Sequence, residues 1–264
     1  MAALPASSWN HPRSLAHRGG GTLAPENTLA ALDAGHGRGY RAAEIDAVLT
    51  ADEVPVLLHD ETLERTTDGK GSIGDTTLAQ LARLDAGRWF GPKFAGTRVP
   101  TLEQALERCW ALGVWLNIEI KPVRGRERRT GALVAQTVAR FCASKRLEDP
   151  SKCAWFSPLL SSFSPESLQA ARDAAGELPR GLLFGRVPAG WEKSWRALDA
   201  VSVHCDHRFL TRPKAQAVRR RGAALLCYTV DDPRRERELR EWGVDAICTD
   251  RIDRIAPMDG ALPG

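Results

Sequence analysis

The sequence has no apolar run that approaches the ~20 residues needed for a bilayer-spanning helix. Its first residues, MAALPASSWNHPRS, lack the basic start and the apolar core of about 7–15 residues that mark a secretory signal. Its 6 cysteines form no CxxC pair, which argues against a disulfide framework and against thiolate metal sites. These absences predict a cytoplasmic protein with buried thiols and without stable membrane insertion.

A large excess of one charge is also missing. The chain has 37 Lys and Arg against 33 Asp and Glu, for a net charge of +4. Arginines cluster at 124–129, 219–221 and 234–237, but acidic residues are interspersed and no aromatic residues alternate with the clusters. Solvated helix faces explain such clusters, so we expect no nucleic-acid partner. A small anionic molecule remains compatible with this balance.

Short β-type runs alternate with helical patterns along most of the chain. This alternation predicts a parallel sheet covered by helices, and about eight strands in one chain predict closure of the sheet. We therefore expect an α/β fold of the TIM type, a (β/α)8 barrel that spans residues 1–264 as one domain. The expected strands are 14–17, 43–49, 54–58, 114–120, 154–163 with a break at Pro158, 181–184, 200–203, 224–230 and 246–248, and the expected helices are 25–39, 130–145, 164–176, 211–222 and 231–243.

Residues 61–101 interrupt the alternation. This glycine-rich stretch carries a short helical signal and the aromatic pair Trp89 and Phe90. Loops of this length are uncommon in compact domains unless they bind or cover something. We expect a small insertion after the second strand region that covers one end of the barrel, with the two aromatic side chains near a bound substrate.

Charged side chains two residues apart stand in two of the expected strands. Glu44 and Asp46 share one face of their strand, and Glu119 and Lys121 share one face of another. An unpaired charge in a strand buried on both faces is costly, so the pattern indicates a site. Three converging carboxylates need a cation, and oxygen ligands suit Mg²⁺ or Ca²⁺. Lys121 beside that cation would complete a receptor for a phosphate.

Two histidines follow expected strands at the rim where barrel active sites lie. His17 with Arg18 ends the first strand, and His59 with Asp60 ends the strand at 54–58. Two imidazoles can act as acid and base, which phosphodiester cleavage requires. A capped structural histidine or a solvated Glu-x-Lys pair explains each feature alone, but four such features at successive strand ends favour a site.

The remaining histidines have weaker context. His11, His36 and His207 show no comparable neighbours. His204 follows the apolar residues AVSV and could line the site, although a buried structural histidine is the simpler interpretation.

The segments that carry these residues resemble, in order, the signatures of the glycerophosphodiester phosphodiesterase family. They are HRG with PENT, EIDAVLTADEVPVLLHDETLERTTDGKG, NIEIKP, and the later YTVDD and WGVDAICTD. The resemblance implies a TIM-type barrel with an inserted segment, one divalent cation, and hydrolysis of glycerophosphodiesters to glycerol 3-phosphate and an alcohol. The chain departs from the family at Tyr228 and Asp231, where the family commonly has Trp and Asn, which leaves the head-group preference open.

Carried across residue by residue, the resemblance implies distinct roles. His17 and His59 match the acid/base pair, and Arg18, Lys121 and Tyr228 match the substrate contacts, the first two at the phosphate. The metal ligands correspond to Glu44, Asp46 and Glu119. The acid and the base are not distinguished, nor are the native metal and the oligomeric state.

Two other functions compete with this interpretation. A phospholipase-like enzyme would act on lysolipids or intact lipids at a membrane surface, and Trp89, Phe90 and Phe94 could supply its apolar rim. A barrel that binds phosphate ligands without turnover would be expected to have lost an acid/base or metal residue, and this chain retains all of them. A soluble small-molecule substrate is the expected partner.

Overall fold

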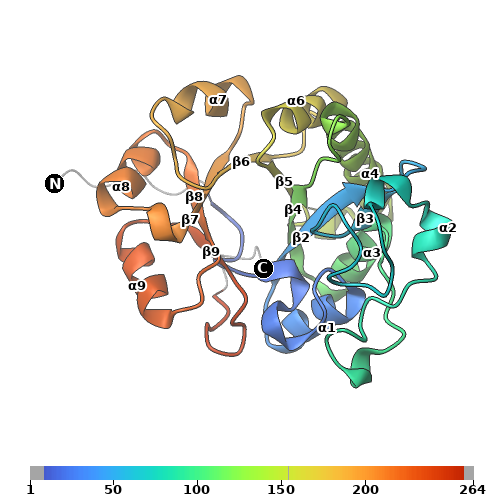
Figure 1. The fold of residues 1–264 in the computed structure, drawn as a ribbon. Helices are drawn as coiled ribbons and strands as arrows, with labels where there is room; N and C mark the ends of the chain where they lie inside the picture. Colours follow the sequence, from blue (N-terminus) through green and yellow to red (C-terminus); the bar gives the residue numbers. More distant parts are fainter. Residues whose placement is uncertain (1–8, 154, 259–264) are drawn as a thin grey trace.

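Eight parallel strands close into a barrel at the centre of the molecule (Figure 1). The computed structural model describes residues 9–153 and 155–258. The strand order is β1-β9-β8-β7-β6-β5-β4-β2, and a further pairing of β1 with β2 closes the ring. This arrangement is the TIM-type barrel expected from the sequence. The strands are β1 (Ser14–Ala16), β2 (Ala42–Leu49), β3 (Pro55–Leu57), β4 (Trp115–Ile120), β5 (Leu159–Ser162), β6 (Arg180–Phe184), β7 (Ser202–Asp206), β8 (Ala224–Tyr228) and β9 (Ala246–Thr249).

The strand β3 lies outside the barrel. It pairs antiparallel with the end of β2, where Ala47, Val48 and Leu49 face Leu57, Val56 and Pro55. His59 was expected to reach the rim at the end of a barrel strand, and this expectation is wrong because β3 is not part of the barrel. β2 extends past the barrel rim, and the hairpin returns the chain to the rim, so that the N–H of Leu58 donates to the carbonyl of Asp46.

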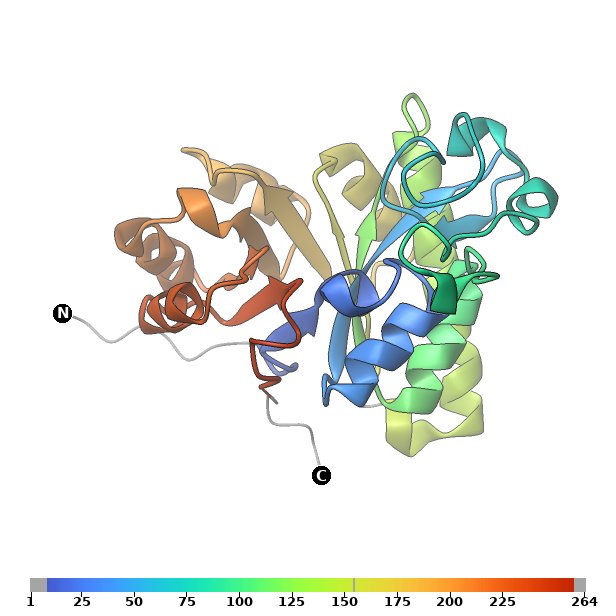
Figure 2. The same ribbon diagram turned by 60° about the horizontal axis from the view of Figure 1, so that its bottom comes forward.

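Helices cover the outer face of the barrel (Figures 1 and 2). The helix expected over 25–39 begins only at Leu29, because Thr28 caps it and residues 25–28 form a turn. α3 and α7 were not expected, although Thr101 and Gln104 form a capping box that marks the start of α3. Among the described residues, no helix is both long and apolar enough to cross a membrane. The helices are α1 (Leu29–Gly37), α2 (Leu78–Leu81), α3 (Leu102–Leu112), α4 (Glu127–Glu148), α5 (Pro150–Cys153), α6 (Pro165–Ala174), α7 (Trp191–Ala197), α8 (Arg212–Arg220) and α9 (Pro233–Glu241).

The expected strand 154–163 is shorter in the structure. Its strand part is β5, and Ala154 lies outside the described residues, as do residues 1–8 and 259–264. The other strands begin and end within about two residues of their expected positions, except that β7 ends three residues later than expected. Below the rim, the inside of the barrel is packed with the side chains of Leu15, Trp115, Leu159 and Leu226.

The insertion forms a small core of its own on the β2–β3 hairpin. Leu63, Ile73 and Leu81 pack there against Val48 and Val56 of the hairpin. Both ribbon views place this segment at the side of the barrel next to β2 and β3, away from α7, α8 and α9 (Figures 1 and 2). The insertion therefore flanks the rim and does not cap the barrel.

A close backbone approach holds the loop after β1 against α1. An ideal Cβ on Gly35 of α1 would lie 2.2 Å from the carbonyl oxygen of Gly19, so only glycine fits there. Gly37, two residues further along α1, has nothing within 4 Å of such a Cβ. The two glycines form a matched pair for testing the loop.

We predict that Gly35→Ala destabilises the protein by about 1–3 kcal/mol, because the loop must move away from α1. Gly37→Ala is expected to be neutral or slightly stabilising, since alanine favours a helix over glycine. Thermal unfolding of both variants measures the difference. Equal Tm values for the two variants would contradict the packing described here.

Candidate active site

Two neighbouring barrel strands present three carboxylates to the barrel interior. β2 and β4 are paired so that Asp46 lies opposite Glu119 and Glu44 lies opposite Asn117. Because side chains alternate along a strand, the alternate residues of β2 and β4, such as Ile45, point outward to the helices. One oxygen of each of Glu44, Asp46 and Glu119 lies within 4.8 Å of the others. Glu44 and Asp46 are buried, and Glu119 is nearly so.

Fixed donors and one ammonium group partly offset the repulsion between these carboxylates. The backbone N–H of Arg18 donates to Glu44 over 3.1 Å, and Asn27 Nδ2 donates to Asp46 over 2.8 Å. Lys121 Nζ lies 3.0 Å from Glu119 and 3.9 Å from Asp46. Burial nevertheless raises the pKa of Glu44 and of Glu119, and the charge of Asp46 raises both further.

The donor set fits a hard divalent cation. The three acids offer oxygen ligands in a cluster with excess negative charge, which is the environment that Mg²⁺ and Ca²⁺ prefer. The buried Oδ1 of Asn117 receives no hydrogen bond from the described residues. This amide oxygen lines the same cavity as the acids, so it offers a further oxygen to a cation or to a water bound to one.

His17 follows β1 and is held by a residue that follows the neighbouring last strand, β9. Its Nδ1 lies 2.7 Å from Asp250, which follows β9, and its Nε2 lies 3.8 Å from Glu44. Burial alone would lower the pKa of His17, but the hydrogen bond to Asp250 and the charge of Glu44 raise it to about 9. The Asp250 and Glu44 carboxylates thus favour the protonated form of this imidazole.

His59 has a separate carboxylate partner. Its Nδ1 lies 2.6 Å from Asp60, which leaves Nε2 as the nitrogen available to a ligand. Burial lowers the pKa of His59, with the charge of Asp46 acting against it. The two histidines therefore differ in their electrostatic surroundings.

A chain of ion pairs connects His59 to Arg18 through the insertion. Arg65 donates to both oxygens of Asp60, over 2.5 and 3.0 Å, and to both oxygens of Glu26, over 2.7 and 2.8 Å. Glu26 in turn accepts from Arg18 over 2.6 Å. Arg18 itself has a φ of 50°, a left-handed conformation that is uncommon outside glycine. These ion pairs fix the orientations of the His59 imidazole and the Arg18 guanidinium at the rim.

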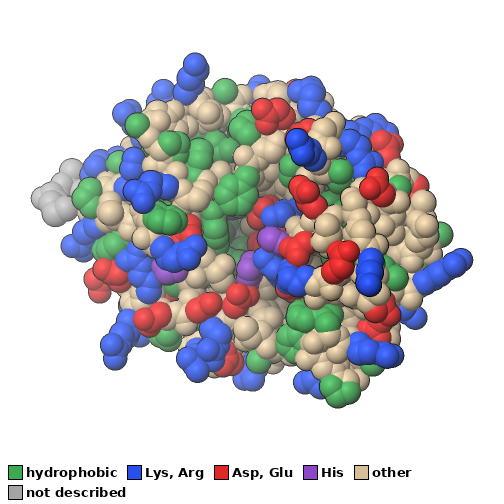
Figure 3. All heavy atoms as spheres, in the orientation of Figure 1, with side chains coloured by type: hydrophobic (Ala, Val, Ile, Leu, Met, Phe, Trp, Pro, Cys, Tyr) green, Lys and Arg blue, Asp and Glu red, His purple; other side chains and the backbone are tan. Residues whose placement is uncertain are grey.

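All eight residues singled out from the sequence line one cavity of about 230 Å³ at the barrel mouth. Figure 3 shows the hollow at the centre of this face, with histidine and acidic side chains on one side and hydrophobic side chains on the other. The hydrophobic side includes Phe163, Leu183 and Tyr228, and the Tyr228 hydroxyl donates to the carbonyl of Phe184 over 2.8 Å. The eight residues are His17, Arg18, Glu44, Asp46, His59, Glu119, Lys121 and Tyr228.

Several partners of these residues were not assigned from the sequence. Asp250 could have been found, because it follows a strand at the same rim as His17. Glu26, Asn27 and Arg65 lie in turns, and no periodic pattern shows which side chains a turn brings to the site. Their roles become visible only through the contacts described above.

The other histidines take structural positions. His204 is buried at the base of the cavity, where it pairs with Ser202 over 2.9 Å and where burial lowers its pKa to about 3. His11 stacks on Trp115, with ring centroids 4.2 Å apart. His207 lies beside Arg235.

The expected role of the aromatic residues in the insertion is wrong. Trp89, Phe90 and Phe94 pack edge to face on one another, with centroids 5.5 and 5.4 Å apart. None of the three lines the cavity at the barrel mouth or the larger cavity beside it. The insertion instead reaches the site through Arg65, while its residues 72–75 line the larger cavity.

Comparison with known proteins places this geometry in context. Residues 17–254 match the model of the glycerophosphoryl diester phosphodiesterase family. A glycerophosphodiester phosphodiesterase of Caldanaerobacter subterraneus is 33% identical over 242 residues, which cover 89% of this chain and 93% of that protein. One from Bacillus subtilis is 30% identical over 254 residues, which cover 91% and 84% of the two chains.

Solved structures show the same fold. A phosphodiesterase from Oleispira antarctica, in complex with the product sn-glycerol-3-phosphate, superposes with a TM-score of 0.83 at 33% identity and covers 93% of this chain and 95% of its own. A glycerophosphodiester phosphodiesterase from Agrobacterium tumefaciens gives a TM-score of 0.70 at 28% identity, with 91% and 97% of the chains covered.

We predict that Mg²⁺ or Ca²⁺ raises the Tm of the wild-type protein, because bound cations stabilise only the folded state. At 100 times the dissociation constant the gain is about 2.7 kcal/mol. Glu44→Gln and Glu119→Gln are expected to reduce the shift, whereas the exposed Glu103→Gln keeps it. An equal shift in all four proteins would contradict the proposed ligand set.

The raised pKa values of Glu44 and Glu119 predict how pH affects the stability of the protein without bound metal. A carboxylate whose folded-state pKa is raised makes the folded state bind protons more tightly than the unfolded chain does. The free energy of unfolding is therefore expected to fall as the pH rises from 4.5, the ordinary pKa of Glu, toward the raised pKa values of Glu44 and Glu119. Urea unfolding of the EDTA-treated protein between pH 5 and about 8 measures this slope, which Glu44→Gln should reduce. A slope unchanged by that variant would argue against repulsion within the cluster.

Proposed function

Because the chain belongs to the glycerophosphoryl diester phosphodiesterase family, we propose that it hydrolyses glycerophosphodiesters to sn-glycerol 3-phosphate and an alcohol. The observation that carries this proposal is the single cavity that contains two histidines, three acids, an arginine and a lysine. The product bound to the relative from Oleispira antarctica supports the same product class for this chain.

Glu44, Asp46 and Glu119 would hold one divalent cation, Mg²⁺ or Ca²⁺, and that cation would offset negative charge on the phosphate. Lys121 and Arg18 are the cationic side chains beside the acids. Lys121 is held by Glu119, and Arg18 by Glu26, so both charges are in place before the substrate binds. A preorganised positive site of this kind stabilises the charge that develops during phosphoryl transfer.

The two histidines would divide the proton transfers. One accepts a proton from the attacking hydroxyl while the other donates a proton to the departing alcohol oxygen. The glycerol arm carries a neighbouring hydroxyl, and a bound internal nucleophile has a large entropic advantage over water. A cyclic phosphate opened by water in a second step, with the two roles reversed, is therefore the proposed route.

A soluble diester is favoured over a membrane lipid. The lipid alternative relied on the aromatic residues of the insertion, and these pack on one another away from both cavities. The cavity at the barrel mouth is small, at about 230 Å³, which suits a glycerol phosphate. The cytoplasmic location stays a prediction from the sequence.

We predict that His17→Ala and His59→Ala each lower kcat by roughly 10²-fold or more, because each removes one proton-transfer group. Alcohol release from glycerophosphoethanolamine with Mg²⁺ or Ca²⁺ measures the effect, and His36→Ala serves as the control.

EDTA is expected to abolish activity in the wild type. A near-normal rate in either variant would overturn the paired-histidine assignment, and activity that survives EDTA would overturn the metal assignment.

A further inference from the structure

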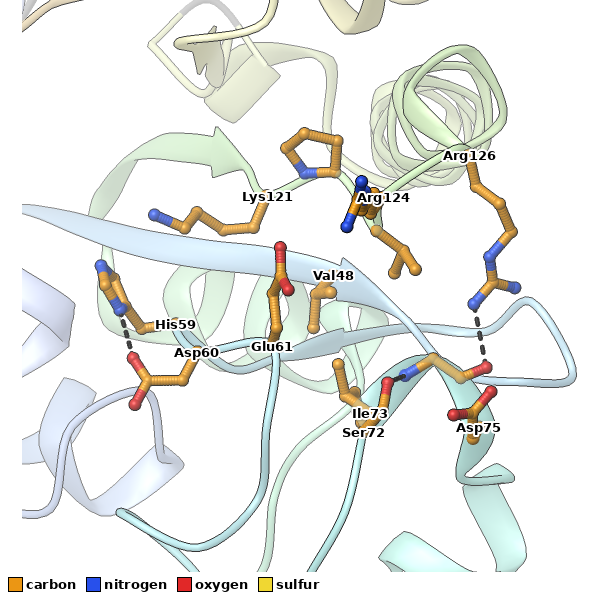
Figure 4. Close-up of a pocket in the computed structure, with 13 residues that line it drawn as sticks. Val48, His59, Asp60, Glu61, Ser72, Ile73, Asp75, Lys121, Arg124 and Arg126 are labelled. Atoms are coloured by element: carbon orange, nitrogen blue, oxygen red, sulfur yellow. Dashed lines mark hydrogen bonds and ion pairs between the residues drawn. The ribbon is translucent and has the colours of Figure 1, made fainter.

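A second, larger cavity of about 610 Å³ lies beside the barrel mouth and shares His59 and Lys121 with the first (Figure 4). It is formed between the insertion and the loop that follows β4. The family match and the barrel mouth leave this cavity without a role. It lies next to His59 and Lys121, two of the residues of the proposed active site.

A phosphodiester bound at the shared residues would extend into both cavities. Two ester arms leave a phosphorus atom in different directions, so a phosphate held beside Lys121 and His59 must extend one arm to each side. The smaller cavity contains the acids and the hydrophobic wall, and it suits the glycerol arm. The alcohol arm would then extend past His59 into the larger cavity.

The lining of the larger cavity is partly apolar and partly charged. Val48, Ile73, Pro122 and Val123 are the apolar residues of its lining. Figure 4 shows Glu61 directing its carboxylate into the cavity from the insertion, with Arg124 on the opposite wall.

Three other polar groups of this cavity have structural partners, whereas the exposed carboxylate of Asp75 forms no hydrogen bond or ion pair with the described residues. Asp60 is bound by His59 and Arg65, Arg126 donates to the carbonyl of Gly74 over 3.0 Å, and Ser72 accepts from the N–H of Gly74. Glu61 and Arg124 are exposed, and neither side chain forms a hydrogen bond or ion pair with any described residue. Both charges are therefore available to a ligand.

We propose that this cavity is the head-group subsite and that it favours an alcohol carrying both an ammonium and a carboxylate, as serine does. An ammonium alone would meet the carboxylates of Glu61 and Asp75, but it would leave Arg124 without an anionic partner. A neutral polyol would leave Glu61 and Arg124 without an ionic partner. A zwitterionic head group gives each of these two side chains an opposite charge. This inference rests on the proposed function.

Three substrates and two variants test the subsite. The substrates are glycerophosphoserine, glycerophosphoethanolamine and glycerophosphoglycerol, and the variants are Glu61→Gln and Arg124→Gln. Wild type is expected to show its highest kcat/KM with the serine ester. Lys70→Gln, which removes an exposed cation of the insertion outside the cavity, is the matched control.

The two variants are expected to give different patterns. Glu61→Gln should lower kcat/KM roughly three- to tenfold for the serine and ethanolamine esters and leave the glycerol ester unchanged. Arg124→Gln should lower it by a similar factor for the serine ester only. Lys70→Gln should match wild type with all three substrates.

Other results would overturn the proposal in distinguishable ways. A uniform fall across the three substrates would show that the two side chains act on the phosphate, and unchanged rates or a wild-type preference for another ester would show that the head group binds elsewhere. Both outcomes contradict the subsite while leaving the diesterase activity in place. Hydrolysis of none of the three esters by wild type, with Mg²⁺ or Ca²⁺ supplied, would instead overturn the proposed function itself.

Discussion

Repulsion between three carboxylates on two adjacent strands is the constraint around which this site is organised. The pairing of β2 with β4 places Asp46 directly opposite Glu119, and the barrel interior removes most of the water that would screen them. Such a cluster is tolerated only where positive charge and hydrogen-bond donors surround it. Arg18, Asn27 and Lys121 meet part of that need, and the remaining negative charge is what a divalent cation would neutralise.

The same requirement explains why distant segments converge at the rim. Arg18 supplies its backbone N–H to Glu44 and its guanidinium to Glu26, while Glu26 also binds Arg65 of the insertion. Arg65 then fixes Asp60, the partner of His59. The insertion thus contributes to the catalytic geometry through one arginine, and its aromatic residues serve its own packing.

The barrel could be predicted from local patterns, and so could the meeting of most of the proposed site residues at one cavity, whereas Tyr228 was assigned only through the family resemblance. Alternation with a period of two places Glu44 and Asp46 on one face whatever the neighbours are, and strand ends of a parallel barrel share one rim. The route of the chain to His59 could not be predicted, since a short strand such as β3 has the same composition whether it joins the barrel or forms a hairpin. The positions of Trp89 and of the Arg65 partners depend on turn geometry, which leaves no periodic signal in the sequence.

The most direct test of this account is a crystal structure of the protein with Ca²⁺ and sn-glycerol 3-phosphate. The account predicts one ion at about 2.3–2.6 Å from oxygens of Glu44, Asp46 and Glu119, with the phosphate between that ion and Lys121. The glycerol is predicted to lie on the Tyr228 side of His59. An ion bound elsewhere while the three carboxylates remain without a ligand, or a phosphate that does not contact Lys121, would contradict it.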